Sequence, residues 1–418
     1  MEYMTLKKKY YQIKNPEQFE IFYQSRLNGE CSVKSGLMMY PFNKRLEVRD
    51  RIAYEIFYSQ TRELALLKES VYTYSKKIEL LLNELPAIAK QHLFLNTLIN
   101  ELQGTNEIEG VKSTRKELGD AVSNVLSKNK NERRFTGLVK QYLKFMDSKY
   151  NSIKNVEEFR SIWDELVGEE EKEDIPDGDM FRKSSVEIKD GENGKVIHRG
   201  DTDEQNIKVD LEKLVLEMNN KEIPSLEKCF MAHYFYEYVH PFYDGNGRTG
   251  RFIVCSYLSR KLDMMSAITF SATIANNKEY YYKAFTNMSE SLNRAEATFF
   301  IKRMLKIVIM GQKQIIDEII EGTDRLNKAY ELIRQCKLND LENEVLYMLF
   351  QQYIFGNYVD NLADKEISDV LNKSRHVISK TMNNLENKGY VDIKSKRPKR
   401  HIISNNLKER FEKEWTAY

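Results

Sequence analysis

Hydrophobic residues recur at helical spacing over most of the chain. From Ile52 to Leu102, stretches such as ELALLKESVYTYSKKIELLLNEL place an apolar residue every three or four positions, which is the pattern of amphipathic helices. Pro86 interrupts this run and predicts two helices rather than one. The pattern returns in RFTGLVKQYLKFMD, in VEEFRSIWDELVG and in long stretches of residues 210–335. The chain is therefore expected to be mainly α-helical.

One segment in the middle of the chain changes period. In FRKSSVEIKDGENGKVIHRG, residues 181–200, apolar and polar positions alternate on both sides of DGENG, which predicts a β-hairpin. The acidic segment EEEKEDIPDGDM before it carries Pro and Gly and is typical of a loop. An isolated two-stranded hairpin is marginal alone. Its presence among helices therefore favours a functional use over an ordinary surface hairpin.

Beyond Cys336 the chain becomes a small basic unit. LENEVLYMLFQQY, DKEISDVLN and SRHVISKTMNNLENKGYVDI predict three helices and a strand, and KSKRPKRHIIS predicts a basic turn with a return strand. This order resembles a winged helix-turn-helix, and residues 373–400 carry nine Lys or Arg against two acidic residues. Such a unit binds DNA in some proteins and serves dimerisation or protein docking in others. In the DNA-binding interpretation, one set of residues faces a major groove and the wing contacts phosphates: Arg375, His376 and Lys380, then Lys396, Arg397 and Arg400.

Composition limits the partners and the cellular compartment that can be expected for the protein. The 418 residues carry a formal net charge of +2, so a nucleic-acid surface would have to be local. Four cysteines lie far apart and match no zinc or disulfide spacing, which favours a reducing compartment. No signal-peptide pattern opens the chain, and no apolar run is long enough to span a bilayer. We expect a cytoplasmic protein with no membrane partner.

The densest chemistry lies in HPFYDGNGRTGR, His240–Arg251, which joins two predicted helices. The sequence Gly245–Gly247 permits backbone conformations that turn successive N–H groups into one concavity. Such a nest at a helix N-terminus binds phosphate. Arg248 and Arg251 lie three apart on the first turn, so both can converge on one anion. The segment therefore predicts a phosphate site.

Two further side chains of this segment suggest chemistry. Asp244 directly precedes the nest, where a carboxylate can hold a magnesium ion that bridges phosphate oxygens. His240 ends the preceding helix, where an imidazole can accept a proton from a hydroxyl near neutral pH. The alternative is a tight helix–helix turn made by the glycines with solvated arginines, but such a turn requires neither arginine.

These twelve residues match the signature of the Fic family, HPFx(D/E)GNGRxxR, and the chain resembles that family over roughly Leu93 to Ile309. The resemblance implies an all-helical core with a short β-hairpin flap, and transfer of AMP from ATP to a protein hydroxyl. In that case His240 is the general base, and Asp244 is the ligand of the Mg²⁺ cofactor. The residues implied for ATP binding are Asp244, Gly245, Asn246, Gly247, Arg248, Thr249, Gly250, Arg251, Tyr281 and Tyr282.

The resemblance extends to the hairpin and to a tyrosine-rich segment. In the family, a flap beside the active site pairs with an extended segment of the target by adding a strand. The corresponding residues here are Ser184, Ser185, Val186, Glu187 and Ile188. Tyr281 and Tyr282, in EYYYKAF, are candidates for contact with adenosine, although core packing explains them about as well. The asparagine that the family often has seven residues after the second tyrosine is Ser289 here, which leaves that contact open.

A second motif resembles the inhibitory pattern of the family, (S/T)xxxE(G/N). It is TNEIEG, with Thr105, Glu109 and Gly110, and the first two residues share a helix face. A Glu109 carboxylate paired with Arg251 would remove a donor that the γ-phosphate needs. Alone, the pattern is equally a capped helix end. With a complete Fic motif it predicts an enzyme held at low activity.

These observations predict four regions and two competing functions. The regions are an N-terminal helical region over residues 1–150 with the inhibitory helix near 96–110, a Fic catalytic domain over 151–310, a connecting helix over 311–337 and a winged-helix domain over 338–418. One function is a protein adenylyltransferase that modifies a Ser, Thr or Tyr hydroxyl of a target or of itself. The other is a DNA-binding regulator that uses its Fic domain for self-modification. Transfer of another phosphate-containing group, removal of AMP and homodimer formation also stay open.

Overall fold

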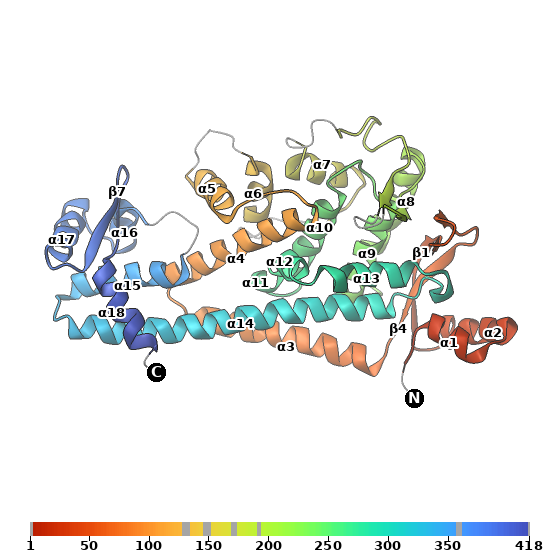
Figure 1. Cartoon of the computed structure of the whole chain (residues 1–418), viewed down its shortest axis with the longest axis horizontal. Helices are drawn as coiled ribbons and strands as arrows, with labels where there is room; N and C mark the ends of the chain where they lie inside the picture. The colour runs from red at the N-terminus through yellow and green to blue at the C-terminus, as the bar shows by residue number, and fades with distance from the viewer. Residues whose placement is uncertain are drawn as a thin grey trace. The chain divides into compact units, whose positions relative to one another are not determined.

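A computed structural model describes residues 3–127, 134–144, 152–168, 174–189, 194–356 and 362–416. The chain forms two compact units. The first unit comprises Met1–Lys76, Glu101–Ser113 and Arg133–Lys313, and the second comprises Lys77–Asn100, Thr114–Glu132 and Gln314–Tyr418. Three long helices contribute residues to both: α3 (Arg62–Glu84), α4 (Ala87–Ile108) and α14 (Thr298–Gln335) (Figure 1). The expected mainly α fold with short hairpins is confirmed.

The first unit begins with two capped helices and two hairpins. Helix α1 (Leu6–Ile13) starts where the Thr5 side chain accepts from the Lys8 N–H, and α2 (Pro16–Leu27) is capped in the same way by Asn15. Strand β1 (Ser32–Met39) pairs antiparallel with β4 (Tyr54–Ser59), and β2 (Phe42–Asn43) pairs with β3 (Val48–Arg49). The region expected to be helical therefore also contains strands.

The strand β4 corrects the helical pattern that we placed from Ile52 onward. Residues 54–59 form a strand, and helix α3 begins at Arg62. The residues Ile56, Phe57 and Tyr58 are all fully buried. A short run of apolar residues buried on both sides has no period that separates a strand from a helix. The break at Pro86 does separate α3 from α4, as expected.

The centre of the first unit is helical. Helix α9 (Ser225–Val239) and helix α10 (Asn246–Ser259) pack against each other and are buried over almost their entire length. They run through the interior of the unit (Figure 1). Around them lie α6 (Thr136–Leu143), α7 (Glu157–Leu166), α8 (Glu204–Asn219), α11 (Met264–Ala267), α12 (Phe270–Ala275), α13 (Lys278–Ser289) and a short 3₁₀ turn, Ser291–Asn293. The segment that joins α9 to α10 is HPFYDG.

The middle hairpin is shorter than expected. Strand β5 (Glu187–Lys189) pairs with β6 (Val196–Arg199), and of the predicted DGENG turn only Gly194 lies among the described residues. Ser184, Ser185 and Val186, which we placed in the strand, precede it. The Arg182 guanidinium explains their path, because it donates to the backbone carbonyls of Ser184 and Asp201 and holds this segment against the unit.

The second unit has one apolar core. Helices α15 (Asp340–Phe355), α16 (Asp364–Val370) and α17 (Arg375–Asn387) are followed by the antiparallel pair β7 (Val391–Lys396) and β8 (Lys399–Ile403). Ile367, Ile378, Met382 and Val391 meet in the core of this unit. The order is the predicted one, with the unpredicted helix α18 (Asn405–Thr416) added. Helix α5 (Arg115–Leu126) also belongs to this unit.

Two predicted helices have other bounds in the structure. The connecting helix expected from residue 311 is the second half of α14, which is continuous from Thr298 to Gln335. The inhibitory helix is the end of α4, which starts at Ala87. Among the described residues, no helix is both long and apolar enough to cross a membrane.

Candidate active site

His240 terminates helix α9 in a left-handed conformation, with φ of 54° and its N–H bonded to the Tyr236 carbonyl. Its Nδ1 lies 3.3 Å from the carbonyl oxygen of Glu237. A proton on Nδ1 would be held by that carbonyl, which leaves Nε2 as the nitrogen that can accept a proton. Burial, aided by the Arg182 cation, lowers the pKa of His240 to about 4. The imidazole is therefore neutral at neutral pH.

The loop after His240 is fixed by aromatic packing and by Asn246. The Asn246 Oδ1 accepts from the Phe242 N–H at 2.9 Å, and its Nδ2 donates to the Phe242 carbonyl at 2.8 Å. The Asn246 side chain is thus engaged with the Phe242 backbone, and the group of Asn246 that remains for a phosphate is its backbone N–H. Trp163 of α7 stacks on Phe242 with ring centroids 4.9 Å apart and donates Nε1–H to the Asp244 carbonyl. No pattern in the sequence indicates this role of Trp163.

Gly245 has to be glycine for two reasons. Its φ is +78°, a region that favours glycine. A Cβ there would also lie 2.7 Å from Val167 and 2.9 Å from Trp163. The turn at Gly245 places the first N–H groups of α10 at the buried start of the helix, and these have no partner within the helix. The backbone nest expected from the sequence therefore coincides with the N-terminus of a 14-residue helix.

Asp244 can hold a magnesium ion only if the phosphate oxygens of a substrate supply further ligands. Its carboxylate is partly exposed, and Oδ1 accepts from the Gly245 N–H. In the described part of the chain, no group of three or more His, Cys, Asp or Glu could hold a metal. Magnesium commonly takes one or two carboxylates together with water and phosphate oxygens. A single carboxylate beside a phosphate site matches that mode.

Arg251 meets the end of α4. Its Nε donates to Thr105 Oγ1 at 3.1 Å, its Nη2 to the Thr105 carbonyl at 3.0 Å and its Nη1 to Glu109 Oε1 at 2.8 Å. The guanidinium side chain is 1% exposed and the carboxylate 25%. Burial acts to lower the pKa of Arg251, but the Glu109 carboxylate outweighs it and raises the pKa above its ordinary value. These two segments, distant in sequence, therefore form one charge pair.

The Glu109 carboxylate also covers the start of α10. A Cβ built on Gly247 would lie 2.1 Å from Glu109 Oε1, so the carboxylate rests directly on the glycine backbone. Gly110, with φ of +74°, ends α4 immediately afterwards. An anion already occupies the space beside the helix N-terminus, and a phosphate at the same place would have to displace it.

The other motif residues of α10 are buried. Arg248, on the first turn, is 1% exposed, and Thr249 is fully buried with its N–H bonded to the Gly245 carbonyl. Gly250 allows a close approach, since a Cβ there would lie 2.3 Å from Glu237 Oε1. Glycine at position 250 therefore leaves room for a second carboxylate.

Glu237 is a site residue that the sequence analysis missed. It lies one turn before His240, with Oε2 3.9 Å from His240 Nδ1. Burial raises its pKa to about 8, with Arg251 acting to lower it and Glu109 to raise it. Its position three residues before the histidine, on the same helix face, was the available signal.

A pocket of about 240 Å³ joins these groups. Its lining includes the predicted residues Glu109, Ile188, His240, Gly247, Arg251, Tyr281 and Tyr282. Tyr281 is buried, and its hydroxyl lies 2.8 Å from His233 Nε2, whereas Tyr282 is 45% exposed. Tyr282 is thus the more accessible of the two. Ser289, which departs from the family pattern, also lines the pocket.

The residues proposed for DNA lie in the second unit. Arg375, His376 and Lys380 are exposed on α17, as are Lys396 and Arg397 near the tip of the β7–β8 hairpin. Arg400 of β8 is half-buried.

Comparison with known proteins supplies the family. Residues 154–258 match the family model described as Fic/DOC family. A Fic family protein from Desulfovibrio desulfuricans G20 aligns with 83% of this chain and 98% of its own, at 17% identity and a TM-score of 0.52. Fic-1 from C. elegans aligns with 60% of this chain and 72% of its own, at 17% identity and a TM-score of 0.42. A Fic domain containing signaling protein from Bacteroides thetaiotaomicron VPI-5482 aligns with 61% and 95%, at 16% identity and a TM-score of 0.43. The chain contains a domain of the Fic/DOC family, at residues 154–258.

Proposed function

We propose that this protein transfers AMP from ATP to a Ser, Thr or Tyr hydroxyl of a target protein, and that it modifies itself as well. The observation that supports this best is the contact between Arg251 and Glu109 over Gly247. This contact fills the space beside the N-terminus of α10, where a phosphate would bind, with a carboxylate of the chain, and the neutral imidazole of His240 lines the same pocket. Phosphoryl-type transfer depends mainly on positioning and charge stabilisation.

In the proposed reaction, the target hydroxyl oxygen attacks the α-phosphorus while the bond from that phosphorus to the bridging oxygen breaks. Pyrophosphate leaves, and the hydroxyl proton goes to Nε2 of His240. The N–H groups at the start of α10 bind phosphate oxygens, and Arg248 and Arg251 bind the distal phosphates. Mg²⁺, when bound at Asp244, would neutralise charge on the phosphates of ATP. Exposed backbone of the β5–β6 hairpin orients the target by strand addition.

In this proposal, Glu109 keeps the enzyme at low activity. A charge-assisted hydrogen bond of this kind contributes about 1.5–3 kcal/mol. ATP has to displace the Glu109 carboxylate before its γ-phosphate can pair with Arg251. Binding in a displaced position would leave the α-phosphate out of line for attack.

Intact mass after incubation with each nucleoside triphosphate and Mg²⁺ tests the proposal. We expect the protein, and above all its Glu109→Gly variant, to gain the mass of one or more AMP groups from ATP. Gain of a UMP, GMP or phosphate mass instead would assign a different donor and contradict AMP transfer. Loss of AMP from a previously modified protein, without any gain from ATP, would assign the reverse reaction.

DNA binding by the second unit is a second candidate function. Its support is the exposure of Arg375 and Lys380 on α17 together with Lys396 and Arg397 on the hairpin. Affinity for duplex DNA should fall steeply with salt, and reversal of Lys396, Arg397 and Arg400 to Glu should weaken it. Retention of full duplex affinity by that triple variant would refute this surface.

A further inference from the structure

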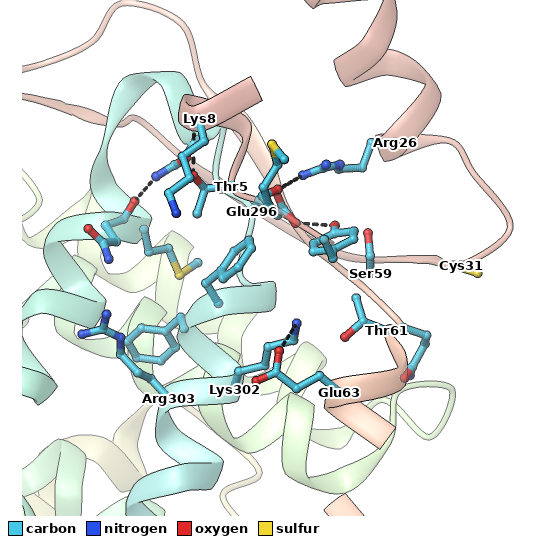
Figure 2. Close-up of a pocket in the computed structure, with 18 of the residues that line it drawn as sticks. Thr5, Lys8, Arg26, Cys31, Ser59, Thr61, Glu63, Glu296, Lys302 and Arg303 are labelled. Carbon is cyan, nitrogen blue, oxygen red and sulfur yellow. Dashed lines mark hydrogen bonds and ion pairs between the residues drawn. The ribbon is translucent and has the colours of Figure 1, made fainter. Parts of the chain in front are cut away.

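A second hollow in the first unit is much larger than the active-site pocket. It measures about 1660 Å³ and lies between α1, α2, the adjoining ends of β1 and β4, the start of α3, α13 and the start of α14. Most small-molecule sites are about 300–1000 Å³. This N-terminal cleft, shown in Figure 2, is therefore large enough for an extended ligand.

Positive charge dominates the N-terminal cleft. Seven Lys or Arg and three Glu line it. Two of the glutamates already have partners: Glu296 pairs with Arg26 at 2.9 Å, and Glu63 pairs with Lys302 at 3.1 Å and with Lys306 at 2.8 Å. Figure 2 shows the Arg26–Glu296 and Lys302–Glu63 pairs on the cleft wall. The Lys302 side chain is only 6% exposed. A buried ion pair therefore orders this part of the wall, unlike an ordinary exposed surface.

Four cations of the cleft have no such partner. No ion pair is found within the described residues for Lys8, Arg62, Lys283 and Arg303. They come from α1, α3, α13 and α14, so the positive charge is spread along the cleft instead of gathered at one point. Lys8, Arg62 and Lys283 are exposed. A ligand with several spaced negative charges matches this distribution better than a single anion does.

Aromatic rings lie beside two of the arginines that line the cleft. Arg26 lies 4.4 Å from the centroid of Tyr3 and 4.9 Å from that of Phe22. Arg303 lies 4.5 Å from the ring of Tyr280, and each of the three rings is partly exposed in the cleft. Basic grooves with interleaved aromatic side chains are typical of single-stranded nucleic-acid sites, where phosphates meet cations and bases stack on rings.

Hydroxyl and amide side chains complete the lining, among them Thr5, Ser59, Thr61 and Asn287. Such groups, with Lys and Arg, make most contacts to phosphate oxygens in protein–nucleic acid complexes. We propose that the N-terminal cleft binds a short single-stranded oligonucleotide. Its volume, its spaced charges and its rings favour this ligand over an acidic peptide, whose carboxylates would use the cations and leave the rings unused.

The cleft is distinct from the active-site pocket, and helix α13 separates them. Tyr280, Lys283 and Asn287 of this helix face the cleft, whereas Tyr281, Tyr282 and Phe285 line the active-site pocket. Binding in the cleft therefore does not depend on AMP transfer. The proposal stands or falls separately from the proposed enzymatic function.

Cys31 provides a local readout of occupancy. It lines the cleft and is exposed, whereas Cys229 and Cys255 are buried and Cys336 lies in the second unit. In the 418-residue chain with Cys336→Ser, the rate of N-ethylmaleimide addition to Cys31 would be measured against increasing single-stranded oligothymidylate of about eight nucleotides. We expect saturable protection of Cys31 by at least about fivefold, and the same protection in a His240→Ala background. Unchanged Cys31 reactivity at saturating oligothymidylate, as judged by anisotropy of a labelled oligonucleotide, would overturn the proposal.

Variants and competitors separate this site from other polyanion binding. Lys8→Glu with Lys283→Glu should raise the oligothymidylate concentration needed for half-maximal protection by roughly tenfold or more, since each reversal replaces an attraction to phosphate by a repulsion. The matched control is Lys221→Glu with Lys261→Glu, two exposed lysines of the same unit outside the cleft, which should protect like the parent. Equal protection of Cys31 in the Lys8/Lys283 double variant and in the Lys221/Lys261 control would overturn the proposal. So would protection by an oligoglutamate of equal charge, which assigns the cleft to an acidic protein segment, or by thymidine monophosphate with no gain from chain length.

Discussion

Two hollows of the first unit treat positive charge in opposite ways. In the active-site pocket, each of the three nitrogens of the buried Arg251 guanidinium donates a hydrogen bond to Thr105 or Glu109. In the N-terminal cleft, Lys8 and Lys283 are exposed and lack a carboxylate partner among the described residues. A ligand of the pocket must therefore displace the Glu109 carboxylate, whereas a ligand of the cleft would neutralise lysines that have no carboxylate partner among the described residues. The same kind of residue produces a gated site in one place and an open site in the other.

The largest effect should come from removing the base of the pocket. His240→Ala, made in the Glu109→Gly protein, should reduce AMP transfer by about 10²- to 10⁴-fold, since general-base catalysis contributes on that order. ATP binding measured by calorimetry should persist, because the imidazole makes little phosphate contact. Labelling with ATP would give the rate.

The same variant also tests whether the active-site pocket and the N-terminal cleft are separate sites. Its affinity for oligothymidylate in the cleft should equal that of the parent, since His240 does not line the cleft. Undiminished AMP transfer would show that another group accepts the proton. A loss of oligonucleotide affinity would show that the two hollows are one site.

The next effect should come from opening the pocket. Glu109→Gly frees the Nη1 donor of Arg251 and removes the carboxylate from Gly247. We expect transfer to rise by roughly ten- to a hundredfold, the equivalent of the 1.5–3 kcal/mol attributed to the contact. Self-modification measured by intact mass should rise in parallel.

Two variants check that the gain comes from this contact. Glu107→Gly removes an exposed carboxylate two residues earlier, where it pairs with Lys278, and should leave the rate near that of the parent. Glu109→Gly combined with Arg251→Ala should be inactive, because the freed guanidinium is needed for the distal phosphates. A Glu109→Gly protein no faster than the parent would reduce TNEIEG to a helix end.

The open site should respond to salt. Single strands lose affinity with a slope of about −0.7 in log K against log salt per phosphate neutralised. Four unpartnered cations then give a slope of about −3, or roughly a 50-fold loss between 50 and 200 mM salt. Anisotropy titrations with oligothymidylate measure this slope, and Lys8→Glu with Lys283→Glu should halve it. A slope near zero would mean that the cleft cations do not contact phosphate.

The sequence predicted the helical fold, because helical spacing is a local pattern. The motif from His240 to Arg251 is local too, and the structure places His240, Gly247 and Arg251 at one pocket, while their catalytic roles stay predictions. The sequence also singled out Glu109, since a motif match needs no geometry. The sequence could not reveal contacts between segments that are distant in sequence and meet only in the folded chain. Trp163 lies far from Gly245 in sequence but shapes the turn there. The pattern of residues 54–59 does not reveal the strand β4, because its apolar residues are buried on both faces.

The N-terminal cleft illustrates the same limit more strongly. Its unpartnered cations are single residues on four helices, each in an ordinary polar context along the chain. The net charge of +2 gave no sign of them, because the excess arises from which residues face the cleft. Neither composition nor spacing contains that information.

The smallest effect should be that of acid on the opened pocket. Burial and the nearby Arg182 cation lower the pKa of His240 to about 4, and Glu109 opposes this shift, so Glu109→Gly will not raise it. The base form prevails above the pKa, and the rate of Glu109→Gly should stay nearly constant from about pH 8 to about pH 5. It should fall only as pH approaches 4, where His240 takes up its proton. Initial rates at saturating ATP and Mg²⁺, with circular dichroism at each pH to verify folding, would measure the profile. A half-maximal rate near pH 6.5 in a folded protein would show that the imidazole is solvated and free of the Arg182 field, as an ordinary surface histidine is.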